Sequence, residues 1–210
     1  WGGSAAQMVA FAEPLVAAGH AVVAFDGPAH GASPGRTSPL PRFARAFEAV
    51  IASHGPPAGI IAHSFGCAVT ALVSVRGLPP VPTVFIAPIT RPLAVFRTFL
   101  ERLSFRARAV DVAVAMGQRH YDVSWVEIDA LARAASQRSP LLVIHDSDDR
   151  SVPIEAGRKL VAAWPGATWH ETTGLGHMRI LRDPDVVARA RGFVTGANGA
   201  RIAPALRGAA

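Results

Sequence analysis

Short apolar runs alternate with longer helical patterns along this chain, and this alternation limits the folds that it can adopt. The runs are rich in Val, Ile, Leu and Phe and lie at residues 21–25, 59–62, 83–87 and 141–145. Near-continuous apolar strands of this length are typical of a parallel sheet that helices cover on both faces. A weaker run at residues 168–171 can supply one more strand. The pattern predicts a doubly wound α/β fold.

The segments between these runs carry the start signals of helices. We predict helices over residues 4–18, 40–53, 65–76, 154–164 and 184–194. Ser4 and Gln7 fit a capping box, in which each side chain bonds a free backbone N–H at the helix start. Asp183 and Pro184 fit an N-cap followed by a proline at the first helical position, where its missing N–H costs nothing.

Residues 90–139 interrupt the alternation with a mainly helical segment, which we predict to be a small lid inserted between two strands. A chain of 210 residues, 50% hydrophobic and 17% charged, suits a single globular core, which we place at residues 1–195. Residues 196–210 lack sustained periodicity and are predicted to be a flexible tail.

The formal net charge of +6 comes almost entirely from arginine, since Lys159 is the only lysine. The densest group, from Arg91 to Arg108, coincides with apolar residues at helical spacing, which favours an amphipathic helix with a solvated basic face. We therefore predict no nucleic-acid partner; a nucleic-acid site would reveal itself by a steep salt dependence of association.

Residues 56–75 are apolar enough to suggest a membrane span, but they contain His63, Ser64 and glycines. Polar groups that face lipid are costly, so a buried strand followed by a buried helix is predicted, and no membrane span. Cys67 is the only cysteine, which excludes an internal disulfide framework. Free cysteines are usually buried, so we expect a buried thiol. Because no disulfide framework indicates an oxidising compartment, we expect a cytoplasmic location.

One stretch within this region has the pattern of a catalytic turn. Residues 62–66 read Ala-His-Ser-Phe-Gly, which matches the motif G-x-S-x-G with alanine at the first glycine. In that motif a buried strand turns sharply into a helix, and the corner residue holds its hydroxyl above the sheet. Ser64 would be this residue, and Gly66 would allow the helix and the strand to approach closely.

A serine hydroxyl is a poor nucleophile at neutral pH, so it needs a base within reach and a carboxylate that orients the base. The run at 141–145 is followed by Asp146, Asp148 and Asp149, and the run at 168–171 is followed by His177. Because the carboxyl ends of parallel strands share one edge of the sheet, these groups can meet Ser64 there.

The order Ser, Asp, His resembles that of the α/β-hydrolase family. The resemblance spans the chain to about Val194. It rests on residues 1–4, 26–33 and 62–66, and on the acid and histidine loops at residues 149–153 and 176–177. It implies an α/β-hydrolase fold and a serine hydrolase of carboxylic esters or related small-molecule acyl substrates, which needs no cofactor and no metal.

The resemblance also assigns roles at the catalytic centre. It places the acid three residues before a Val-Pro pair, which selects Asp149 over Asp146 and Asp148. It selects His177 as the base, in preference to His145, His170 and His120. His63 is expected to pack, because neighbouring residues of a strand point to opposite faces. Asp26 and His30 are expected to stabilise their loop.

The family's oxyanion hole uses the backbone N–H of the residue after the nucleophile, here Phe65, and a second donor that aligns with Trp1. In this family a further strand precedes that second donor and lies between the strands that correspond to residues 21–25 and 59–62. We therefore expect that N-terminal strands are missing, that the chain is a fragment, and that it folds poorly alone.

The lid carries candidates for an apolar acyl pocket, and they are Phe96, Phe99, Met116, Tyr121 and Trp125. The alternative that these residues form the lid's own core is equally open. Thioesterase, peptidase, C–C bond hydrolase and cofactor-free perhydrolase activities share the same fold and triad. A non-catalytic module that binds a small molecule or a protein remains the alternative from another class.

Overall fold

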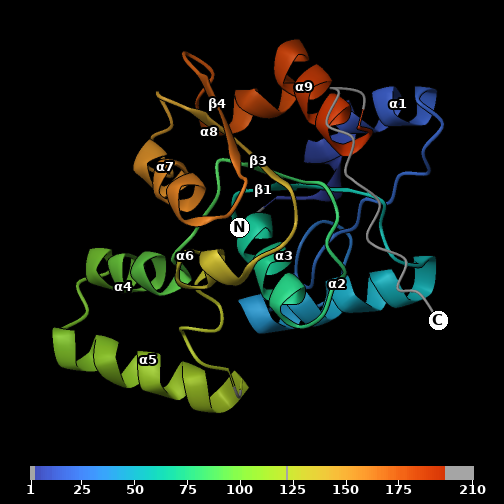
Figure 1. Cartoon of the computed structure of the whole chain (residues 1–210). Helices are drawn as coiled ribbons and strands as arrows, with labels where there is room; N and C mark the ends of the chain where they lie inside the picture. The colour runs from blue at the N-terminus through green and yellow to red at the C-terminus, as the bar shows by residue number, and fades with distance from the viewer. Residues whose placement is uncertain (1–2, 122, 197–210) are drawn as a thin grey trace, which may run out of the picture.

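The computed structural model describes residues 3–121 and 123–196, and its described strands form one parallel sheet (Figure 1). The strands are β1 (Ile60–His63), β2 (Thr83–Ile86), β3 (Leu141–Asp146) and β4 (Thr168–Thr172), in that spatial order. In the register, Ala62 lies opposite Phe85, Phe85 opposite Val143, and Val143 opposite Trp169. The predicted α/β fold with a parallel sheet is confirmed, and the carboxyl ends of its strands share one edge.

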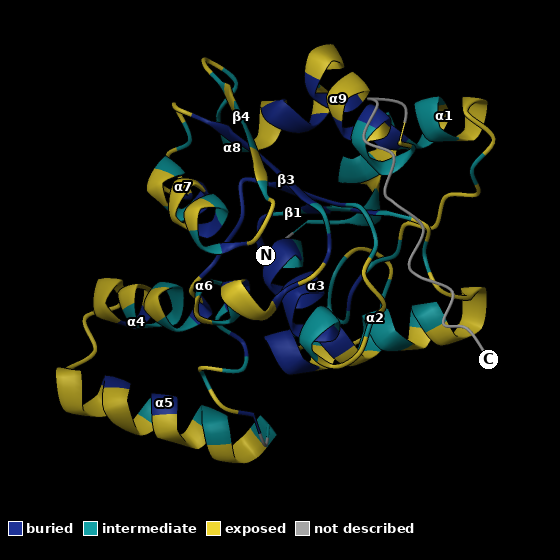
Figure 2. Ribbon diagram, viewed as in Figure 1, coloured by how far each residue is buried: buried dark blue, intermediate teal, exposed yellow. Residues whose placement is uncertain are grey.

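Helices cover both faces of the sheet (Figures 1 and 2). On one face, Ile86 and Ile144 belong to a core cluster with residues of α1 (Val9–Ala17) and α9 (Pro184–Val194). On the other face, Phe85 packs in a cluster with residues of α3 (Phe65–Val75) and α7 (Ile154–Ala163). Every residue of β2 and β3 is buried, which explains why these runs are apolar without alternation.

The predicted helices agree with the structure apart from the start of the first one. The helix α2 spans Leu40–His54, and the first predicted helix begins as a 3-10 turn, η1 (Ala5–Met8), before α1. The predicted Asp183 cap is confirmed by the N–H groups of Asp185 and Val186, which donate to its carboxylate.

The predicted capping box is wrong, because the Ser4 side chain makes no cap hydrogen bond. The carboxylate of Asp26 accepts the N–H of Ala5 at 2.7 Å instead. A charged acceptor binds such a donor more strongly than a hydroxyl does. The second oxygen of Asp26 accepts the N–H of Ala32 at 2.9 Å, so this carboxylate joins the helix start to its own loop.

The strand predicted at residues 21–25 is wrong as well. These residues have no regular secondary structure, and Val22 and Val23 are 37% and 49% exposed. An extended segment becomes a strand only when its backbone shares a hydrogen-bond ladder with a neighbour. In the part of the chain that the structure describes, no strand pairs with this segment, and β1 is the first strand of the sheet.

The segment at residues 90–139, called the insert below, lies between β2 and β3. It contains α4 (Pro92–Arg102), α5 (Ala107–Tyr121), α6 (Ala130–Arg133) and the 3-10 turn η2 (Ala134–Ser136). The helices α4 and α5 pack through a small cluster around Leu100 and Val110 and lie away from the sheet (Figure 1). Figure 2 shows α5 exposed along most of its length. None of the described helices is long and apolar enough to cross a membrane.

Two glycines on helices that pack on the sheet differ in the space around them. A Cβ atom added at Gly66 would lie 3.8 Å from the Cβ of Ala62, which is an ordinary contact. The close approach expected at Gly66 is therefore not found. A Cβ atom added at Gly157 on α7 would lie 2.8 Å from His145 Nδ1 and 2.8 Å from the Trp169 ring.

We therefore expect the same substitution to act in opposite directions at the two positions. Gly66→Ala should raise the free energy of unfolding by up to about 1 kcal/mol, because alanine favours helices. Gly157→Ala should lower it by about 1–3 kcal/mol through overpacking. Chemical denaturation measures both values, and equal effects at the two sites would contradict this account of the packing.

Candidate active site

Ser64 forms the corner between β1 and α3. Its φ of 53° and ψ of −113° are uncommon for a residue other than glycine, so the corner is strained. The end of β2 holds it there, because the Ser64 N–H donates to the carbonyl of Ile86 at 2.9 Å. The N–H of Ile89 donates in turn to the Ser64 carbonyl at 3.2 Å. The residue is 8% exposed, and its hydroxyl faces His177.

His177 lies in the short helix α8 (Gly176–Arg179), which follows β4. Its Nδ1 is 2.7 Å from Asp149 Oδ2, and its Nε2 is 3.0 Å from Ser64 Oγ. An ionised carboxylate only accepts, so Nδ1–H donates to Asp149 and Nε2 accepts the Ser64 hydroxyl proton. The structure thus brings together the three residues that the sequence suggested, from positions that follow β1, β3 and β4.

The carboxylate of Asp149 is 0% exposed. Its Oδ1 accepts the N–H groups of Ser151 at 2.7 Å and Val152 at 2.9 Å, which fixes the loop after β3. Burial alone would raise the pKa of Asp149, but hydrogen bonds from His145, His177, Val152 and Ser151 outweigh it and hold that pKa well below its usual range. The carboxylate therefore stays charged beside His177.

The other two loop carboxylates do not contact His177. Asp148 is exposed, and its carboxylate accepts the N–H of Gly174 at 3.1 Å. Asp146 is 0% exposed and accepts four donors. These are the Thr172 hydroxyl at 2.7 Å and the N–H groups of Leu175 at 3.1 Å, Gly176 at 2.9 Å and Asp148 at 3.0 Å.

Sequence reasoning weighed Asp146 only as an acid and missed these contacts, because most of its donors lie 26 to 30 residues further along the chain. Burial would raise the pKa of Asp146, but its hydrogen bonds from Thr172, Gly176, Asp148 and Leu175 outweigh this effect and lower the pKa. A run of acidic residues directly after a buried strand was the only signal in the sequence.

Two further histidines contact the acid and the base. His145 on β3 is 0% exposed, and its Nε2–H donates to the Val152 carbonyl at 3.0 Å while lying 3.4 Å from Asp149 Oδ2. Its Nδ1 is buried without a partner among the described residues. His63 packs its ring against His177, with 4.6 Å between ring centroids, and its Nε2–H donates to the His177 carbonyl at 3.0 Å.

The remaining predicted site residues lie as follows. Phe65 is the first residue of α3, directly after Ser64, and Trp1 lies outside the described residues. In the insert, Phe96 stacks on Trp125, and Tyr121 packs against a core cluster that includes Phe65. Phe99 and Met116 are 52% and 58% exposed. The acyl pocket therefore stays a prediction, with its candidates divided between the insert's core and its surface.

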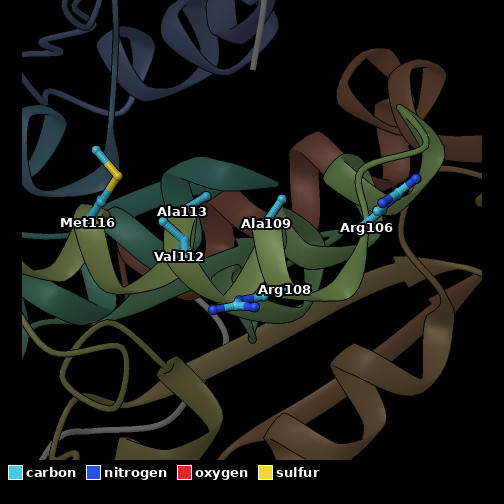
Figure 3. A pocket seen from close by; sticks show the side chains of 6 residues that line it. All are labelled: Arg106, Arg108, Ala109, Val112, Ala113 and Met116. Carbon is cyan, nitrogen blue, oxygen red and sulfur yellow. The ribbon is translucent and has the colours of Figure 1, made fainter.

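An open hollow of ≈ 470 Å³ runs along α5 (Figure 3). It is lined by Arg106, Arg108, Ala109, Val112, Ala113 and Met116. Of the predicted pocket residues, only Met116 lines this hollow. Ser64, Asp149 and His177 do not line it. The described part of the chain contains no group of three or more His, Cys, Asp or Glu residues that could hold a metal ion.

The family model described as the alpha/beta hydrolase family matches residues 1–190. The chain belongs to this family. Among the curated proteins, no sequence matches it. The fold is similar to that of a monoacylglycerol lipase from Paleococcus ferrophilus, with 20% identity, a TM-score of 0.66, and coverage of 93% of this chain and 90% of that one.

Two other solved structures are similar to this chain. The esterase RhEst1 from Rhodococcus sp. ECU1013 has 20% identity and a TM-score of 0.61, and the match covers 93% of this chain and 87% of the esterase. A meta-cleavage product hydrolase from Pseudomonas fluorescens has 15% identity and a TM-score of 0.65, with the same two coverages, 93% and 87%. At these identities the likeness shows the fold.

A pH measurement tests the placement of His63. Burial and the neighbouring His177 lower the pKa of His63 to about 4, below its usual 6.5. Between these two pH values the folded chain binds fewer protons than the unfolded chain, so stability falls as the pH is lowered through this window. Across this window His63 lowers the free energy of unfolding by about 3 kcal/mol.

We expect His63→Gln to flatten this slope, because glutamine cannot titrate, while its amide can still donate to the His177 carbonyl. Chemical denaturation of both proteins at several pH values between 6.5 and 4 measures the effect. Asp149 and Asp146 add little to this slope, because a carboxylate of the unfolded chain takes up its proton near pH 3.8, below this window. Parallel stability curves for the two proteins would contradict the burial of His63 as a neutral group.

Proposed function

We propose that this chain is a serine hydrolase that cleaves a carboxylic ester or a related small-molecule acyl substrate, with a carboxylesterase-like reaction. The observation that supports this proposal is the continuous hydrogen-bonded line from Asp149 through His177 to Ser64, at 2.7 Å and 3.0 Å. Membership in a family of hydrolases supports it independently. The reaction draws on these side chains and water, and it uses no cofactor.

In the first half of the reaction, Ser64 Oγ attacks the substrate carbonyl carbon while His177 Nε2 takes the hydroxyl proton. Asp149 stabilises the imidazolium that results, and its lowered pKa keeps it ionised for this role. The tetrahedral intermediate then expels the alcohol, which receives the proton from His177. Ser64 is left as an acyl ester.

In the second half, a water molecule gives a proton to His177 Nε2 and attacks the acyl carbonyl, which releases the carboxylic acid and restores Ser64. The negative oxygen of both tetrahedral intermediates needs backbone donors. Phe65, the residue after the nucleophile at the start of α3, supplies one N–H in this proposal, and Trp1 aligns with the second.

His63 supports this chemistry by remaining neutral. Its ring lies against His177, and a positive charge there would oppose the imidazolium that each half-reaction forms. Because the pKa of His63 is lowered to about 4, the ring carries no charge at the pH where a histidine base works.

A fluorophosphonate probe tests the proposed nucleophile. We expect covalent labelling of Ser64, identified by peptide mass spectrometry, and hydrolysis of p-nitrophenyl esters by the same protein. Ser64→Ala should abolish both. Labelling that persists in Ser64→Ala, or a lack of labelling together with ligand binding but no turnover, would contradict the proposal and favour a non-catalytic binding module.

A pair of charge-removing variants tests the proposed acid. Asp149→Asn should lower kcat by about 10⁴-fold, because asparagine favours the wrong histidine tautomer. Asp148→Asn removes the same charge from the same loop at an exposed side chain, and it should stay close to wild type. Equal losses in the two variants would mean that charge, rather than the contact with His177, explains the effect.

A further inference from the structure

The buried carboxylate of Asp146 links the two loops that carry the acid and the base. It belongs to the last residue of β3 and lies in register with Thr172, the last residue of β4. Its two oxygens accept the Thr172 hydroxyl and the backbone N–H groups of Leu175 and Gly176. The last two donors immediately precede His177.

We propose that Asp146 is a positioning residue for His177. Its carboxylate fixes the turn at residues 174–176, and this turn places the imidazole between Asp149 and Ser64. This inference rests on the proposed function only in its catalytic consequence. The anchoring of the turn is a separate physical claim, and it can be measured without any substrate.

The turn needs an anchor outside itself. Gly174 and Gly176 have φ values of 82° and 67°, and glycine enters this left-handed region without the cost that other residues meet. The same freedom lets the turn adopt other shapes. The helix that follows, α8, has four residues, which is too short to be stable alone. Local structure therefore does not hold His177 in place.

The contacts of the turn divide into internal and external ones. Arg179 donates to the carbonyls of Gly174 and Leu175, but it belongs to the same segment and moves with it. Asp146 belongs to a fully buried strand in the interior of the sheet. Because it accepts the N–H groups of Leu175 and Gly176, it ties the turn to a strand that is buried along its whole length.

The carboxylate is matched to this task by its charge and its burial. An ionised carboxylate is an acceptor at both oxygens, and each oxygen of Asp146 accepts two donors. Water does not compete there, because the residue is 0% exposed. An asparagine would turn an NH₂ group toward two of these donors, and the repulsion would displace them.

The matched variants for the test are Asp146→Asn and Asp148→Asn, which remove the same charge from neighbouring positions. Asp148 is exposed and accepts one N–H of the same turn, from Gly174. The first measurement is amide hydrogen exchange by NMR at Leu175 and Gly176. We expect slow exchange in wild type and in Asp148→Asn, and much faster exchange in Asp146→Asn.

The second measurement is the rate of fluorophosphonate labelling at Ser64, with kcat and KM for a p-nitrophenyl ester. A displacement of His177 by about 1 Å should lower kcat and the labelling rate by about 10²-fold in Asp146→Asn, with KM nearly unchanged. A purely structural role would lower the fraction of folded protein, and it would leave the kcat of the folded fraction unchanged.

The outcomes separate the two claims. Fast exchange at Leu175 and Gly176 in wild type, or an Asp146→Asn protein with wild-type kcat, overturns the positioning role. If Asp146→Asn does not fold, Thr172→Val removes one donor and should shift exchange and kcat in the same direction by a smaller amount. Slow exchange with no labelling of wild type would overturn the proposed function while supporting the anchored turn.

Discussion

The hydrogen bond between His177 Nδ1 and Asp149 Oδ2 is the contact on which the rest of the site depends. It joins the loop after β3 to the loop after β4, and it sets which nitrogen of His177 faces Ser64. It forms because the two strands are parallel neighbours in register, so that both loops leave the same edge of the sheet. Without that register, neither the acid nor the base would reach the nucleophile.

Each partner in the line is held by a different neighbour. The strained Ser64 corner is fixed by the backbone of β2, and Asp149 is fixed by the N–H groups of its own loop. His177 depends on anchors from two strands, with Asp146 of β3 holding the turn before it and His63 of β1 holding its carbonyl. The histidine is therefore the member whose position rests most on contacts distant in sequence.

The sequence predicted what local patterns encode. The apolar runs of β2 and β3 and the cap at Asp183 could be read directly, because burial and capping leave a residue signature. The exposed segment at 21–25 looked like a strand, but pairing with a neighbour is a property of the fold and not of the run. The bond from Ala5 to Asp26 and the contacts of Asp146 with the segment before His177 were missed for the same reason, because tertiary structure sets these partners.

The tautomers of the histidine rings test the central claim most directly, and ¹⁵N-resolved NMR of the ring nitrogens reports them at neutral pH. The geometry predicts that His177 carries its proton on Nδ1, with a proton signal shifted far downfield by Asp149, while His63 and His145 carry theirs on Nε2. Replacing Asp149 by asparagine should remove the downfield signal. A His177 ring protonated on Nε2 alone would contradict the account.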